Sequence, residues 1–168
     1  MSDEKTSEYS PWWVLLENLL IIAMLVFGFL GMRFVAINGF PLLSTLWAAF
    51  LLIMLGFVLR RTLCRHCKSF GKLCHCGWGR YARLVTTPGT PGTYPLPWLG
   101  GLVWGIFMGL PILAMLVGVF ADSIKLTDHL PYLIPFVVLV VINSLLHVKD
   151  CRACCMRNVC PGSAAKTP

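Results

Sequence analysis

Eight cysteines in two short runs carry the most distinctive chemistry of this chain. Each run contains a C-x2-C pair, and two residues between cysteines let a tight turn direct both sulfurs at one metal ion. Four thiolates complete the closed tetrahedral shell of structural zinc, so eight thiols predict two four-sulfur sites. The predicted metal ligands are Cys64, Cys67, Cys74 and Cys76 of the first run, and Cys151, Cys154, Cys155 and Cys160 of the second.

The sequence leaves open how these thiols divide between two sites. Each run could close a site of its own, or the first C-x2-C pair could share an ion with the second. We favour the shared arrangement, because Cys154 and its neighbour Cys155 point in different directions in most backbone conformations. The shared ion would be bound by Cys64, Cys67, Cys151 and Cys154, and the other four thiols would bind a second ion. Such a site would clip together the helix ends that precede the two runs.

Zinc is the favoured cofactor, and an iron–sulfur cluster is the alternative. Clusters also take four cysteine ligands, and Cys160-Pro161 is similar to the C-P ending of a ferredoxin run. The compact C-x2-C-x2-C spacing of a four-iron motif is absent from the sequence. Palmitoylation and thiol catalysis complete the alternatives, since cysteines next to a membrane are targets of acylation.

Glycines and histidines accompany the cysteines. The glycines of the first run permit the positive φ that metal-binding turns require. They are Gly71, Gly77 and Gly79. Histidine can replace a thiolate, but beside enough cysteines it more often lies outside the set of ligands. We therefore expect His66, His75 and His147 to be neighbours of the ligands.

The elements that must position these thiols are apolar helices. The chain has 168 residues, of which 57% are hydrophobic and 12% are charged, against about 25% charged in ordinary soluble domains. A helix needs about 20 apolar residues to cross the hydrocarbon core of a bilayer. Four stretches reach or approach that length and predict membrane-spanning helices: Trp12–Gly31, Phe40–Leu59, Trp98–Phe120 and Leu130–Leu146.

The predicted fold is an all-α integral membrane protein, a four-transmembrane-helix bundle with a small cysteine-rich cytosolic metal-binding knuckle. The chain divides into a polar N-terminus (1–10), a first helix hairpin (11–60), a cysteine-rich basic loop with a Pro/Gly connector (61–97), a second hairpin (98–147) and a cysteine-rich tail (148–168). In the third predicted helix, Gly101, Gly105 and Gly109 repeat every four residues and predict a packing face. We favour a neighbouring helix of the same chain as its partner.

Basic residues determine the predicted orientation. An even number of spans puts both termini and the long middle loop on one side, which carries every lysine and arginine except Arg33 and Lys125. Short loops rich in these residues stay in the cytoplasm. Both cysteine runs should therefore face the cytosol, where thiols remain reduced, so disulfides are not expected.

The basic side also predicts contact with the lipid bilayer through anionic lipids, which attract clustered lysines and arginines. This accounts for the net charge of +7 without a nucleic-acid partner. We expect the first span to be retained and not cleaved as a signal peptide. Together with the short chain, this predicts a multi-pass protein of a prokaryotic inner (plasma) membrane with both termini in the cytosol.

Glu17 is the only charged side chain well inside a predicted span. It lies about one helical turn after the interfacial residues Trp12 and Trp13, close to the cytosolic surface. We expect its carboxylate to pair with Arg60 or Arg61. A proton or cation site is the alternative, because charged groups inside membrane spans often serve transport.

The sequence favours a non-enzymatic role, and it assigns no catalytic residue. The leading hypothesis is a small integral membrane subunit or adaptor whose cytosolic metal site docks a protein partner. The alternative is an iron–sulfur electron-transfer subunit of a membrane redox complex. The second alternative, a membrane thiol-disulfide oxidoreductase, requires an exposed cysteine pair of low pKa. A transporter ranks last, because polar groups do not converge near the middle of the spans.

Four spans with two C-x2-C pairs resemble the plan of the quinone-linked disulfide-forming membrane proteins, the group that includes vitamin K epoxide reductase. In that group the reactive cysteines serve the oxidising compartment. Here every cysteine lies on the basic side of the membrane, so the resemblance assigns no site residue.

Overall fold

The computed structural model of the protein describes residues 8–120, 125–154 and 156–165. Within these ranges all regular structure is helical, and no β-strand is present. Four helices are long and apolar enough to cross a membrane. This confirms the predicted all-α fold and is consistent with a membrane protein.

Three of the four long elements agree closely with the predicted spans. Helix α1 covers Pro11–Met32, and α5 covers Trp98–Phe120. The second span is built from consecutive helical segments: α2 (Leu42–Ile53), η1 (Met54–Val58), α3 (Leu59–Thr62) and the 3-10 turn η2 (Cys64–His66). A short helix, α4 (Trp78–Val85), follows in the loop, and α6 (Leu126–Ala153) is the last long helix.

Helix α6 is longer at both ends than the predicted Leu130–Leu146. Hydropathy identifies only the apolar part of a helix, which can lie in the hydrocarbon core of the bilayer. The backbone hydrogen bonds of the helix continue through polar residues such as Lys149 and Asp150. As a result, Cys151 lies in the last helical turn of α6, and the rest of the second cysteine run follows the helix end.

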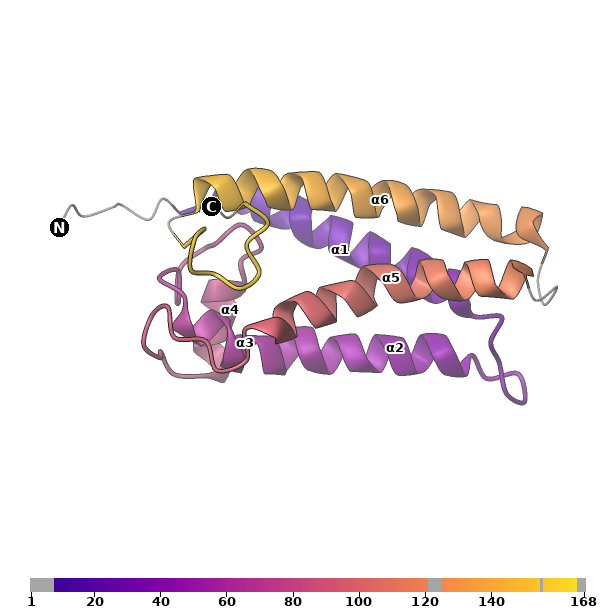
Figure 1. Cartoon of the computed structure of the whole chain (residues 1–168), viewed down its shortest axis with the longest axis horizontal. Helices are drawn as coiled ribbons and strands as arrows, with labels where there is room; N and C mark the ends of the chain where they lie inside the picture. Colours follow the sequence, from indigo (N-terminus) through magenta and orange to yellow (C-terminus); the bar gives the residue numbers. More distant parts are fainter. Residues whose placement is uncertain (1–7, 121–124, 155, 166–168) are drawn as a thin grey trace.

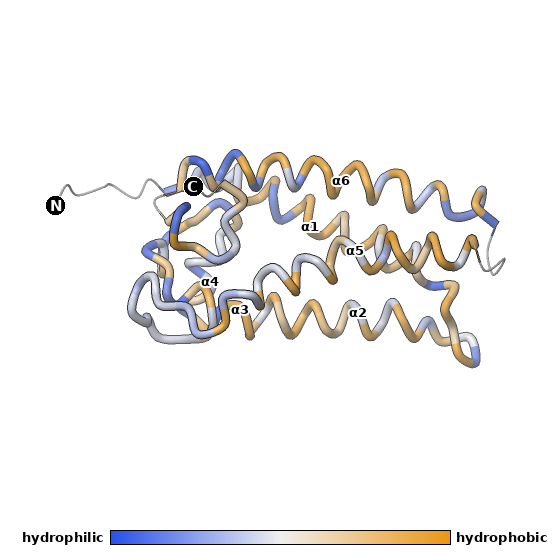
Figure 2. Tube along the Cα trace, in the orientation of Figure 1, coloured by the Kyte–Doolittle hydropathy of each residue, from blue (hydrophilic) through white to orange (hydrophobic). Residues whose placement is uncertain are grey.

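The four long helices lie along one another, and α4 and the segment after α6 lie at the same end of them (Figure 1). Helix α1 packs against α2, α5 and α6. Large buried side chains from each long helix form the core, among them Met24, Trp47, Phe107 and Phe136. Hydrophobic residues dominate the long helices, and hydrophilic residues gather towards their ends (Figure 2). Both cysteine runs are thereby held at one end of the molecule.

A glycine on α1 permits close contact between the helices. A Cβ added at Gly28 would lie 2.8 Å from Trp47, 3.1 Å from Phe136 and 3.3 Å from Pro111. These neighbours belong to three other helices, so Gly28 lies where all four long helices meet.

The predicted packing of the α5 glycine stripe against another helix of this chain is wrong. Gly101, Gly105 and Gly109 are exposed, and no described atom of another element lies within 4 Å of a Cβ added at any of them. A four-residue repeat of glycine marks a face that a helix could approach closely. It does not indicate which face the rest of the chain covers.

Replacing Gly28 by leucine should destabilise the protein by about 2 kcal/mol, because overpacking a close-packed interior forces side chains out of their rotamers. Gly105→Leu is the control and should leave stability unchanged, because its side chain would enter open space. Thermal unfolding of both variants in detergent, followed by circular dichroism, measures the difference. Equal destabilisation by the two substitutions would contradict the described packing.

Candidate metal centre

The first C-x2-C pair lies where the second span ends. The turn η2 begins at Cys64, and the backbone N–H of Cys67 donates to the carbonyl oxygen of Cys64 at 3.2 Å. The N–H of Ser69 then donates to the Cys67 sulfur at 3.4 Å. A backbone N–H directed at a cysteine sulfur favours the thiolate, which is the form that binds metal.

Three glycines fold the rest of the first run back onto its start. Gly71 and Gly77 have φ values of 78° and 71°, so the predicted positive φ is confirmed at both. Gly79 does not have the expected positive φ. It is required for space, because an added Cβ would overlap the carbonyl oxygen of Ser69. The N–H of Gly79 donates to the Cys74 sulfur at 3.3 Å, which positions this thiol beside the first pair.

Replacing Gly79 by alanine should open this loop at a cost of about 1–3 kcal/mol, because a backbone carbonyl cannot move aside as a flexible side chain can. Limited digestion with trypsin should then cleave after Lys68 and Lys72 faster than in the wild type. Gly101→Ala, which places its methyl group in open space, is the control. Wild-type digestion rates for Gly79→Ala would refute the close backbone approach.

The second run begins on α6 and turns back across the helix end. Cys151 follows His147 by one helical turn, and its sulfur lies 3.5 Å from His147 Nε2. The same ring nitrogen is 2.9 Å from the carbonyl oxygen of Gly162, which ties the segment after α6 to the helix. The N–H of Met156 donates to the Cys154 sulfur at 3.4 Å, so both C-x2-C pairs receive the same kind of contact.

The two runs meet at one cavity of about 170 Å³, which we call the cysteine-lined cavity. Apolar and aromatic side chains complete its wall, among them Leu59, Tyr94 and Trp104. The predicted ligands that line it are Cys64, Cys67, Cys74, Cys76, Cys151, Cys154 and Cys160. None of these cysteines forms a disulfide. The remaining predicted ligand, Cys155, lies outside the described residues.

The described sulfurs that line this cavity are not gathered closely around one point. Thiolates bound tetrahedrally at about 2.3 Å from zinc lie about 3.8 Å from one another. Among the described residues, no three cysteine sulfurs lie within 4.8 Å of one another. An iron–sulfur cluster binds its thiolates through different iron atoms, so its ligands stand further apart.

Burial controls the charge of the thiols. It raises the pKa of Cys67 to about 12, and it raises the pKa of Cys76 well above its ordinary value. These thiols therefore hold their protons at neutral pH, and a metal must displace protons to bind. Arg60 brings positive charge to the site. Its Nη1 donates to the Cys64 sulfur at 3.8 Å, and its guanidinium lies 3.6 Å from the centre of the Trp78 ring.

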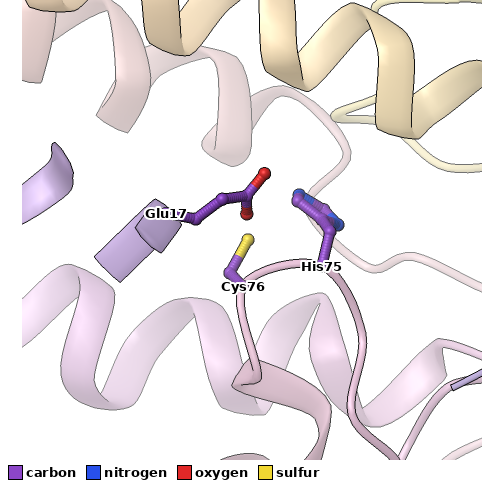
Figure 3. Close-up of side chains that lie close together, drawn as sticks. All are labelled: Glu17, His75 and Cys76. Atoms are coloured by element: carbon purple, nitrogen blue, oxygen red, sulfur yellow. The ribbon is translucent and has the colours of Figure 1, made fainter. Parts of the chain in front are cut away.

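A second group of side chains that could hold a metal lies between α1 and the loop, where His75 and Cys76 also line the cavity. A carboxylate oxygen of Glu17, a ring nitrogen of His75 and the sulfur of Cys76 lie within 4.8 Å of one another. Figure 3 shows these side chains converging from α1 and from the loop before α4. Glu17 is only 5% exposed. Burial lowers the pKa of His75 to about 4, so its ring is neutral and able to bind a metal.

These surroundings of Glu17 differ from the expected ion pair with Arg60 or Arg61. Arg60 contacts the first cysteine run, and Arg61 is exposed. The carboxyl group of Asp150 on α6 lies beside Glu17 instead. The available sequence signals were the isolated charge at Glu17 and the histidine next to Cys76. Neither signal indicates the direction in which a side chain of α1 points.

Comparisons with protein-family models, with curated proteins and with solved structures give no match to this chain. No relative supplies an activity, a ligand or a partner for it. The geometry and chemistry of the cysteine-lined cavity therefore carry the functional conclusion.

Proposed function

We propose that the cysteine-lined cavity binds an iron–sulfur cluster and that the protein is the electron-transfer subunit of a membrane redox complex. The spacing of the sulfurs carries this proposal. Seven described cysteines line one cavity of about 170 Å³, and no three of their sulfurs lie within 4.8 Å of one another. Clusters take four cysteine thiolates, and hydrogen bonds to sulfur and burial set their reduction potential.

We assign the cluster ligands to both cysteine runs. The assigned ligands are Cys64, Cys67, Cys154 and Cys160, which line the cavity together with Tyr94. This set differs from the shared set expected from the sequence, because Cys160 replaces Cys151, whose sulfur contacts His147.

In this role the cluster accepts one electron from a soluble donor and passes it to an acceptor in the membrane. The position of the cavity supports this path, since Leu63 and Trp104 at the helix ends line one side and the loop lines the other. The rings of Trp78 and Trp104 stack 6.0 Å apart with an angle of 7° between them. This contact holds α4 against α5 beside the cavity.

We further propose that this end of the molecule faces the cytosol of a prokaryote, with the helices in the inner (plasma) membrane. Arg60, Arg80 and Arg83 lie at the same end as both cysteine runs, and loops rich in arginine are retained in the cytoplasm. In this orientation anionic lipids surround the helix ends. A soluble protein partner would reach the cluster from the loop.

An adaptor subunit with a structural zinc site is the second candidate. The observation that favours it is the pair of backbone N–H groups directed at the sulfurs of Cys67 and Cys154, which would stabilise thiolates around zinc as well. Zinc in this position would clip the end of α3 to the end of α6. The loop held by the ion would then dock the partner.

Anaerobic reconstitution of the full chain in lipid nanodiscs, with ferric iron, sulfide and a thiol reductant, tests the electron-transfer role. We expect visible absorption that bleaches when dithionite reduces the cluster and returns when a quinone is added. Visible absorption that dithionite does not change would contradict electron transfer. A protein that takes up zinc and gains no visible absorption would favour the adaptor.

A further inference from the structure

Glu17, His75 and Cys76 offer three different kinds of metal-binding atom at the edge of the cysteine-lined cavity, which His75 and Cys76 also line. Their oxygen, nitrogen and sulfur atoms lie within 4.8 Å of one another. No other trio of His, Cys, Asp or Glu in the described ranges is as closely spaced. Two of the three are neighbours in the loop before α4, and the third projects from α1 (Figure 3).

Contacts that do not use these donor atoms hold the loop against α1. Asn18 Nδ2 donates to the carbonyl oxygens of Val14 at 2.7 Å and of Cys76 at 3.0 Å. The N–H of Tyr9 donates to the carbonyl oxygen of Leu73 at 3.1 Å. The three donor atoms are thus brought together by the fold, which lowers the cost of arranging them around an ion.

Asp150 of α6 lies next to this trio, although its carboxylate is not within 4.8 Å of all three donor atoms. Its carboxyl group lies beside that of Glu17, and its Oδ2 accepts a hydrogen bond from Trp13 Nε1 at 3.2 Å. Once a metal has displaced the proton of the Cys76 thiol, the thiolate and the carboxylates in this buried place require positive charge nearby. A divalent ion supplies that charge, and carboxylate, imidazole and thiolate are all ligands of zinc.

We propose that Glu17, His75 and Cys76 bind one divalent transition-metal ion, with Asp150 as the fourth ligand. Zinc and cobalt accept this mixture of oxygen, nitrogen and sulfur donors in tetrahedral geometry. The ion joins α1, the loop before α4 and α6 at the membrane surface. This site goes beyond the proposed electron-transfer function, because it uses a single thiolate and needs no iron in the cavity.

Titration of the full chain in lipid nanodiscs with Co²⁺ tests this site, because cobalt bound to protein ligands absorbs visible light. Bound metal is first removed with a chelator under anaerobic, reducing conditions. We expect Glu17→Gln and His75→Gln each to bind one Co²⁺ fewer per chain than the wild type, or to bind it at least about tenfold more weakly. Neither substitution removes a thiol, so the cavity thiols remain available to bind cobalt in both variants.

Two matched substitutions serve as controls and should keep wild-type cobalt binding. His66→Gln changes a histidine of the same loop whose Nδ1 lies 2.9 Å from the carbonyl oxygen of Thr90. Asp128→Asn removes an exposed carboxylate near the start of α6. Thermal unfolding shows which metal-free variants fold. If Glu17→Gln does not, His75→Gln decides the test, because it alters a loop and not a buried helix face.

Wild-type stoichiometry and affinity for cobalt in the folded variants would overturn the proposed mixed-ligand site. Loss of one ion in these variants supports it, whether or not the cavity binds iron. Failure to find iron in the wild type would overturn the electron-transfer function alone, so the two proposals fail separately.

Discussion

Replacing Cys67 and Cys154 together by serine should remove nearly all of the iron that the reconstituted protein binds, and with it the visible absorption. Each sulfur receives a backbone N–H at 3.4 Å, and each lines the cavity from a different cysteine run. A serine hydroxyl keeps its proton at neutral pH, so half of the assigned cluster ligands would be lost. We expect the iron content per chain to fall by about tenfold or more.

The control for this double substitution is His66→Gln, which lies in the same C-x2-C turn but directs its ring to Thr90. It should keep wild-type iron content. Mass spectrometry measures iron per chain, and thermal unfolding shows whether the double variant still folds. Wild-type iron content in that variant would remove both cysteines from the ligand set.

A membrane-impermeant maleimide added to right-side-out vesicles should label none of the eight cysteines, even after bound metal has been removed under reducing conditions. The same reagent added to inverted vesicles should label several of them per chain. The reason is that the described cysteines lie at one end of the molecule, beside the loop in which the arginines are concentrated. We therefore expect labelling in the inverted vesicles and almost none in the right-side-out vesicles.

A cysteine introduced at Ala36 provides the control for this labelling experiment. Ala36 is exposed in the turn between α1 and α2, at the opposite end of the helices from both cysteine runs. Ala36→Cys should be labelled in right-side-out vesicles. Labelling of the native cysteines from that side would reverse the proposed orientation and would place the thiols in an oxidising compartment.

Hydropathy was sufficient to predict the long helices, because the cost of burying a backbone polar group in lipid restricts apolar stretches to helix. An even number of spans also predicted that both cysteine runs lie at one end of the molecule, as the described cysteines do. The end of α6 could not be predicted in this way. Backbone hydrogen bonding continues to Ala153, beyond the residues that suit hydrocarbon.

That difference underlies the new grouping of cysteines that we propose. With the predicted helix ending at Leu146, the one-turn spacing of His147 and Cys151 carried no structural meaning. In α6 the two residues lie on the same helix face, and Cys151 turns towards His147. Whether any of these cysteines binds metal stays a prediction.

Glu17 shows a second limit of the sequence. Helix α1 is apolar around most of its circumference, so no periodicity indicates which face turns inward. An isolated carboxylate near the membrane surface is compatible with two environments. It could pair with an arginine, or it could be buried inside the protein. Only the packing of α1 against α6 and the loop places Glu17 beside His75 and Cys76.

The iron and acid-labile sulfide content of the protein, purified anaerobically from cells in its native membrane form, tests the central claim most directly. We predict iron and sulfide in about equal amounts, together with visible absorption that reduction bleaches. Zinc as the only metal in the protein, without sulfide and without visible absorption, would contradict an iron–sulfur cluster in the cysteine-lined cavity.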